Sequence, residues 1–155
     1  MRFSAVLAVL IFPALVAANP DTDVQVPAAT RSATPAAPSA ESRFDQGQVL
    51  ARQSDWAGAA TAYREATQLR PAFPEAWNGL GHALRKQGRF DESVTAYREA
   101  LRLRPAYPQA LEYLGEAYVQ LGRLAEAREV LERLRPLDPK EAAELAQAIA
   151  KAAKR

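Results

Sequence analysis

A block of the chain repeats itself with a period of 34 residues. The sequence Thr-Ala-Tyr-Arg-Glu-Ala occurs at residues 61–66 and again at 95–100. The sequence Leu-Arg-Pro-Ala, followed by an aromatic residue and Pro, occurs at 69–74 and again at 103–108. A fixed period of this length is the signature of a repeat architecture, in which each unit buries its apolar face by stacking on its neighbours. We therefore expect a stack of similar units.

Each unit has residues that mark the starts and ends of two helices joined by a turn. Pro74 and Pro108 stand where the first residue of a helix tolerates a missing N–H. Gly88 and Gly122 follow 14 residues later, where a left-handed C-terminal cap favours glycine. Other small residues fall inside the expected helices, where glycine costs about 1 kcal/mol in propensity, and close approach of helices best explains them. These residues are Gly47, Gly81 and Gly115 on the first helices and Ala59, Ser93 and Ala127 on the second.

The last unit is three residues shorter than the others. Proline pairs occur at 71/74, 105/108 and 136/139, so the second interval is 31 residues instead of 34. We expect the loss at the end of the second helix of the third unit. With this shift, Leu145 and Ile149 align with Leu80 and Leu84, which predicts that a final helix buries them against the third unit.

That final helix carries its own start and stop signals. Asp138 supplies an N-cap, Pro139 a first residue and Glu141 the acid of a capping box. Lys151, Lys154 and Arg155 suit the negative end of its dipole. The segment 139–155 is therefore predicted to be a capping helix.

The repeated positions resemble the tetratricopeptide repeat, and the resemblance covers about three-quarters of the chain. It implies an all-α fold with three helix-turn-helix repeats and a C-terminal capping helix in a right-handed superhelical stack. The repeats would span 40–73, 74–107 and 108–138. The first departs from the pattern with Arg43 and Gln46 at the Trp and Leu positions, as a terminal repeat can. The second fits best, with Trp77, Leu80, Gly81, Leu84, Gly88, Phe90, Ser93, Tyr97, Ala100 and Pro105.

The N-terminus has the pattern of a secretory signal. Arg2 precedes an apolar stretch at 3–16, and Val16-Ala17-Ala18 offers the small residues that signal peptidase requires. We expect residues 1–18 to be cleaved and 19–39, rich in Ala and Pro, to be a disordered linker. The protein would then be periplasmic or secreted, with no membrane span after cleavage. The alternative is an uncleaved membrane anchor, although the apolar stretch is shorter than the ~20 residues that span a bilayer.

No constellation for catalysis is visible. The chain has no cysteine, and its single histidine, His82, has no partner at metal or nucleophile spacing. No Gly-rich phosphate loop follows a strand. The chain has 20 Lys and Arg residues against 18 Asp and Glu and no cluster of basic residues, so the charge pattern does not indicate nucleic-acid binding. We therefore expect no enzyme activity, cofactor or metal, and no nucleic-acid partner.

The resemblance also implies where a partner would bind, because five positions of each first helix line the concave groove of this family. They place Arg52, Arg85 and Lys86 in one basic spot and Glu112 and Glu116 in an acidic third repeat. The alternative is that these are solvated helix-face charges. The candidate groove residues are Phe44, Gln48, Arg52, Phe73, Asn78, His82, Arg85, Lys86, Tyr107, Glu112 and Glu116.

The type of ligand follows from the same positions. A peptide with acidic groups beside an apolar anchor would suit the first two repeats, with Phe44, Phe73 and Tyr107 as anchors. Phe44 could equally fill the slot of the missing Trp. Members of the family that bind chaperone tails carry Lys and Asn where this chain has Phe44 and Gln48, so that specificity is not expected.

The expected function is thus a non-enzymatic scaffold or adaptor of the periplasm or cell envelope, which docks a peptide or helix of another protein. Two alternatives remain open. The chain could be a structural subunit that assembles with copies of itself. It could also be a membrane-anchored assembly factor, if the N-terminus is retained.

Overall fold

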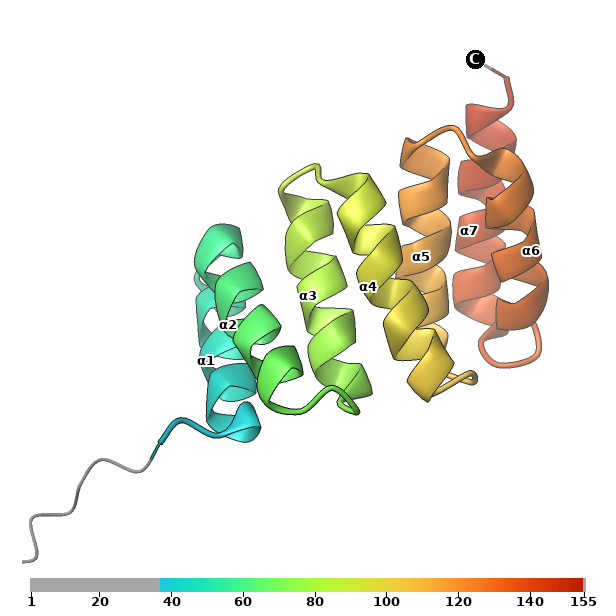
Figure 1. The fold of residues 1–155 in the computed structure, drawn as a ribbon. Coiled ribbons are helices and arrows are strands. Elements are labelled where there is room, and N and C mark those ends of the chain that lie inside the picture. Colours follow the sequence, from blue (N-terminus) through green and yellow to red (C-terminus); the bar gives the residue numbers. More distant parts are fainter. Residues whose placement is uncertain (1–36, 155) are drawn as a thin grey trace, which may run out of the picture. The chain divides into compact units, whose positions relative to one another are not determined.

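The computed structural model describes residues 37–154, which form seven α-helices and no strand (Figure 1). The all-α prediction is confirmed. The expected signal at 1–18 and most of the expected linker lie outside the described residues. The helices are α1 (Ala40–Arg52), α2 (Trp56–Leu69), α3 (Pro74–Lys86), α4 (Phe90–Leu103), α5 (Pro108–Gln120), α6 (Leu124–Leu134) and α7 (Pro139–Ala152).

The helices pair as three hairpins followed by one extra helix. Helix α1 packs on α2, α3 on α4, and α5 on α6, while α2 and α4 each contact the first helix of the next hairpin. The first helices also touch each other in order, α1 with α3, α3 with α5, and α5 with α7. Figure 1 shows this sequence of neighbours from α1 to α7. The first helices, continued by α7, therefore form one face of the stack, which we call the groove face.

The predicted helix ends are confirmed. Pro74, Pro108 and Pro139 are the first residues of α3, α5 and α7. Gly88 and Gly122 have φ values of 75° and 70°, the left-handed conformation in which glycine carries no steric penalty. The first hairpin turns with Ser54 at the equivalent place, also at positive φ (61°).

The glycines inside the first helices mark close contacts between helices. A Cβ on Gly47 would lie 2.7 Å from the Tyr63 ring, and one on Gly81 would lie 2.6 Å from Tyr97 Cε1. Tyr97 is completely buried. The tyrosines of α2 and α4 thus pack where their own first helices have no side chain, and at Gly115 the contact comes from Leu145 of α7, so each of the three glycines marks a close approach of helices.

The irregular third unit also folds as predicted. Helix α6 has 11 residues, whereas α2 and α4 have 14 each. The Asp138 carboxylate accepts a hydrogen bond from the Glu141 backbone N–H at 3.1 Å and so caps α7. Leu145 and Ile149 are buried in the core that α5, α6 and α7 share.

None of the helices between residues 37 and 154 combines the length and the apolar character needed to cross a membrane.

The segment just before α1 ends in a helix cap at Ser39. Ser39 Oγ accepts a hydrogen bond from the Ser42 backbone N–H at 3.1 Å, and Ser42 Oγ accepts one from the Ser39 N–H at 3.0 Å. This reciprocal pair fixes the start of the repeat unit at Ala40.

Candidate functional site

A pocket of about 300 Å³ opens on the groove face. Seven of the residues that the sequence placed in the groove line it, together with three others. The predicted ones are the candidates Phe44, Gln48, Asn78, His82 and Tyr107, with Glu75 and Gln109 at two further groove positions of the family. The others are Tyr63, Gly79 and Tyr113. Helices α1, α3 and α5 all contribute, so the stacking of three repeats creates this pocket.

His82 lies between two aromatic rings. Its imidazole stacks on Tyr113, with ring centroids 5.2 Å apart and planes inclined by 18°, and it meets Trp56 edge-on at 5.4 Å. Burial, with the positive charges of Arg85 and Lys86, lowers the pKa of His82 to about 4. The imidazole is therefore neutral at physiological pH, where it can both donate and accept a hydrogen bond.

Asn78 offers an unused acceptor in the same pocket. Its side chain is 6% exposed, and its Nδ2 donates a hydrogen bond to Gln109 Oε1 at 3.0 Å. Its Oδ1 is buried and accepts no hydrogen bond from the described part of the chain. A ligand carrying an N–H donor can pair with this oxygen.

Glu75 also lines the pocket, and its carboxylate is already paired with Arg104. The pocket therefore has aromatic walls and hydrogen-bonding groups, with a neutral histidine and no free charge. Such a mixture suits a peptide side chain and its backbone better than an ion.

The predicted anchors differ in accessibility. Phe73 is only 8% exposed, packs on Phe44 at 4.9 Å between centroids, and is covered by the Arg70 guanidinium 3.6 Å above its ring. Phe73 is thus a core residue and does not offer a free surface. Phe44 also packs on Tyr63, at 5.6 Å, yet remains half-buried and lines the pocket. It fills core space and borders the groove at once.

The predicted basic spot is smaller than the sequence indicated. Arg85 forms an ion pair with Glu116 at 2.7 Å and lies over the Tyr113 ring. This pair joins α3 to α5 and neutralises Arg85. Arg52 and Lys86 remain exposed near the C-terminal ends of α1 and α3.

A second, acidic pocket of about 170 Å³ lies between α5 and α7. Glu112 and Glu116 of α5 line it with Glu141 and Glu144 of α7. Burial raises the pKa of Glu112 to about 7, and the nearby Glu141 and Glu116 add to the effect. The glutamates of α7 were not among the predicted site residues. The 31-residue shift that aligns Leu145 with Leu114 in the sequence also aligns Glu144 with Tyr113, so the alignment could have indicated Glu144 as a groove residue.

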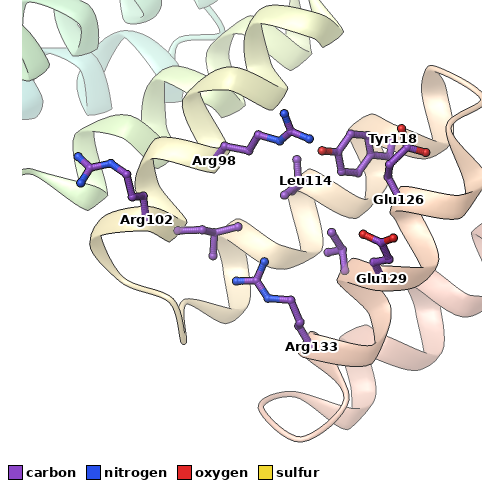
Figure 2. A pocket seen from close by; sticks show the side chains of 9 residues that line it. Arg98, Arg102, Leu114, Tyr118, Glu126, Glu129 and Arg133 are labelled. Carbon is purple, nitrogen blue, oxygen red and sulfur yellow. The ribbon is translucent and has the colours of Figure 1, made fainter.

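The second helices carry a third pocket, of about 330 Å³ (Figure 2). Arg98 and Arg102 border it from α4, and Glu126, Glu129 and Arg133 from α6. The figure shows Arg98 extending toward Tyr118, whose ring centroid lies 5.8 Å from the guanidinium carbon. Both positive and negative side chains line this pocket, and one of them, Arg102, is paired with Glu99 at 2.9 Å.

Within residues 37–154, no three His, Cys, Asp or Glu side chains are grouped so that they could hold a metal ion. The four glutamates of the acidic pocket are therefore not arranged as a metal site.

Several solved structures have the same arrangement of helices. The first TPR of Spaghetti (RPAP3), bound to the HSP90 peptide SRMEEVD, is 23% identical, with a TM-score of 0.71 over 75% of this chain and 94% of that one. The TPR2B domain of yeast Sti1, in a complex with pHsp70, is 26% identical, with a TM-score of 0.69 over 74% and 96%. The TPR domain of Arabidopsis OM64 is 21% identical, with a TM-score of 0.70 over 73% and 95%. No protein of curated function matches the chain.

Family models agree with the structures. A tetratricopeptide repeat model matches residues 78–142, and a TPR repeat model matches residues 47–88. Together they span more than half of the chain and include parts of all three hairpins. The chain therefore belongs to the tetratricopeptide repeat family.

Proposed function

We propose that the protein acts by binding rather than catalysis, as a scaffold that holds an extended peptide segment of a partner on its groove face. The observation that carries the proposal is the pocket between α1, α3 and α5, where Asn78 keeps a buried acceptor unused beside a neutral His82. An extended peptide presents an N–H donor at every residue except proline, and it can place one side chain among the rings of Phe44, Tyr107 and Tyr113.

The solved neighbours support a peptide as the class of ligand, since Spaghetti is seen with a peptide of HSP90 and Sti1 in a complex with pHsp70. An acidic tail of the SRMEEVD kind suits this groove poorly. Phe44 and Gln48 occupy the places of the lysine and asparagine that bind such tails in this family. The third repeat adds Glu112, which forms no ion pair within the described part of the chain and, when ionised, would repel an acidic tail.

We further propose that this scaffold works in the periplasm or outside the cell. Support comes from the sequence alone, through the Arg2 n-region, the apolar stretch at 3–16 and the small residues Ala17 and Ala18. Mass spectrometry of the protein from its native host should find Asn19 as the first residue. Recovery of Met1 in a membrane extract would instead favour a retained anchor.

The binding proposal can be tested with random linear peptides displayed on phage and selected on the full chain. Affinity for a selected peptide should fall about tenfold or more in a His82→Ala/Tyr113→Ala variant, which removes two walls of the pocket. Arg128→Ala, an exposed change on α6, is the matched control and should bind like the wild type. Circular dichroism would check that each variant remains helical.

Equal binding by wild type and groove variant would move the site away from this face. A chain that selects no peptide, and whose elution volume shifts with its own concentration, would favour the alternative of a self-assembling subunit.

A further inference from the structure

The pocket of Asn78 and His82, here called the neutral pocket, and the acidic pocket between α5 and α7 occupy equivalent places in consecutive repeats. Asn78 and His82 of α3 line the neutral pocket, and the residues 34 positions later, Glu112 and Glu116 of α5, line the acidic one. On the next helix of each pocket, Tyr113 of α5 aligns in sequence with Glu144 of α7 through the 31-residue shift. One structural position thus changes from uncharged groups to carboxylates along the groove.

The acidic pocket has more negative than positive charge. Arg85 neutralises Glu116 at 2.7 Å, and the exposed Lys140 lies 3.1 Å from Glu141 and 3.4 Å from Glu144. Glu112 forms no ion pair with any residue in the described part of the chain. Four carboxylates therefore share two cations, and one of these cations is largely in solvent.

The titration of Glu112 agrees with this geometry. Burial, together with the charges of Glu141, Glu116 and Glu144, raises the pKa of Glu112 to about 7, although the charge of Arg85 opposes the shift. An added cation would relieve this repulsion. In the adjoining pocket, Asn78 Oδ1 accepts no hydrogen bond from the described residues and is available to a donor of the ligand. The acidic pocket therefore favours a positively charged group of the ligand, and the pocket of His82 favours an N–H donor.

We propose that the acidic pocket binds the Lys or Arg side chain of a basic peptide whose neighbouring apolar side chain fills the pocket of His82 and Tyr113. This inference rests on the proposed function of the groove and gives its ligand a chemical class. It predicts a ligand of opposite charge to the acidic peptide bound by the Spaghetti neighbour. It also replaces the acidic peptide expected from the sequence, because Arg85 of the expected basic spot is paired with Glu116.

The spacing within such a peptide follows from helix packing. Helices α3, α5 and α7 are successive neighbours on the groove face, and packed helices lie about 8–10 Å apart. An extended peptide rises about 3.3 Å per residue. The basic and apolar side chains should therefore be about three positions apart in the sequence of the ligand.

The experiment uses the phage-displayed random peptides on the full chain near pH 8, where Glu112 is ionised. We expect selected peptides to share a Lys or Arg two to four positions from an aromatic or large aliphatic residue. One such peptide would be synthesised with blocked termini, together with a version in which its basic residue is replaced by Gln. Both would be titrated against the wild type, Glu112→Gln/Glu144→Gln, and the control Glu132→Gln on α6.

The basic peptide should bind the double variant about tenfold more weakly than the wild type, because charge-assisted hydrogen bonds are lost. The Gln peptide should not distinguish the two proteins. Wild-type affinity should also rise between pH 6 and pH 8, and the double variant should lose that dependence.

Selected peptides without a basic residue, or equal affinity of the basic peptide for wild type and double variant, would overturn this inference while leaving the groove as a peptide site. Failure of every peptide to bind would overturn the proposed function as well.

Discussion

Leu145 of α7 packs against Gly115 of α5, in the place where Tyr97 packs against Gly81 one repeat earlier. The third repeat has Leu131 at the position of that tyrosine, and the shorter side chain leaves room that the closing helix fills. Helix α7 therefore completes the core of the third repeat in addition to covering the end of the stack.

Removing the buried side chains of α7 should destabilise the protein strongly. Leu145 and Ile149 are 2% and 4% exposed, and truncating a buried Leu or Ile to Ala costs roughly 2–5 kcal/mol. A Leu145→Ala/Ile149→Ala variant should melt at least ~16 °C below the wild type, since two such truncations cost about 4 kcal/mol or more and 1 kcal/mol corresponds to roughly 4 °C in a domain of this size. Thermal melting followed by circular dichroism measures the effect. Lys151→Ala, exposed on the same helix, should leave the melting temperature unchanged.

A methyl group at Gly81 should destabilise the second repeat although alanine is the better helix former. The new Cβ would lie 2.6 Å from Tyr97 Cε1, and the completely buried ring cannot move away cheaply. We expect a net loss of about 1–3 kcal/mol from overpacking in urea unfolding experiments. Tyr97→Leu, which copies the third repeat, should make Gly81→Ala less harmful in the double variant. Costs that simply add would show that the two residues do not compete for space.

The sequence predicted features that depend on the order of residues along the chain. Pro74 and Gly88 mark helix ends through local backbone geometry, and the 31-residue interval predicted both the shorter α6 and the burial of Leu145. Contacts between neighbouring first helices were not predictable in this way. The Arg85–Glu116 ion pair depends on the stagger and tilt of α3 against α5, which helical periodicity does not specify.

The same limit applies to the candidate site. Family positions placed His82 in the groove, where it lines a pocket, but they did not show that Tyr113 stacks on it, because that contact joins α3 to α5 and depends on how the two helices pack. They also placed Phe73 at the groove edge, whereas Arg70 and Phe44 bury it. Lateral packing between repeats decides which candidates remain accessible.

The raised pKa of Glu112 predicts a pH dependence of stability with a definite sign. Its folded pKa of about 7 lies above the unfolded value of 4.5, so the folded state holds the proton more tightly and loses stability as pH rises from about 4.5 to 7. Glu112→Gln should therefore stabilise the protein at pH 8, by roughly 1 kcal/mol because solvent screens a partly exposed group, and have little effect at pH 4.5. Melting temperatures of both proteins across this range test the prediction. Parallel curves would mean that Glu112 titrates normally.

His82 should titrate far below an ordinary histidine. Burial between Trp56 and Tyr113, and then the charges of Arg85 and Lys86, lower its pKa from 6.5 to about 4. The unfolded chain binds this proton near pH 6.5, so His82 contributes stability above pH 6.5 that is lost as pH falls through 4, opposite in direction to Glu112.

Because His82 is the single histidine of the chain, its imidazole C–H resonances can be followed by NMR without ambiguity. The midpoint should lie near pH 4 in the wild type and should rise slightly in Lys86→Ala, which removes one of the two cations, while Arg128→Ala should leave it unchanged. A His82→Phe variant should lose less stability than the wild type between pH 6.5 and 4.5. A wild-type midpoint near 6.5 would show that the ring is exposed to solvent, and it would remove the neutral wall on which the proposed peptide site depends.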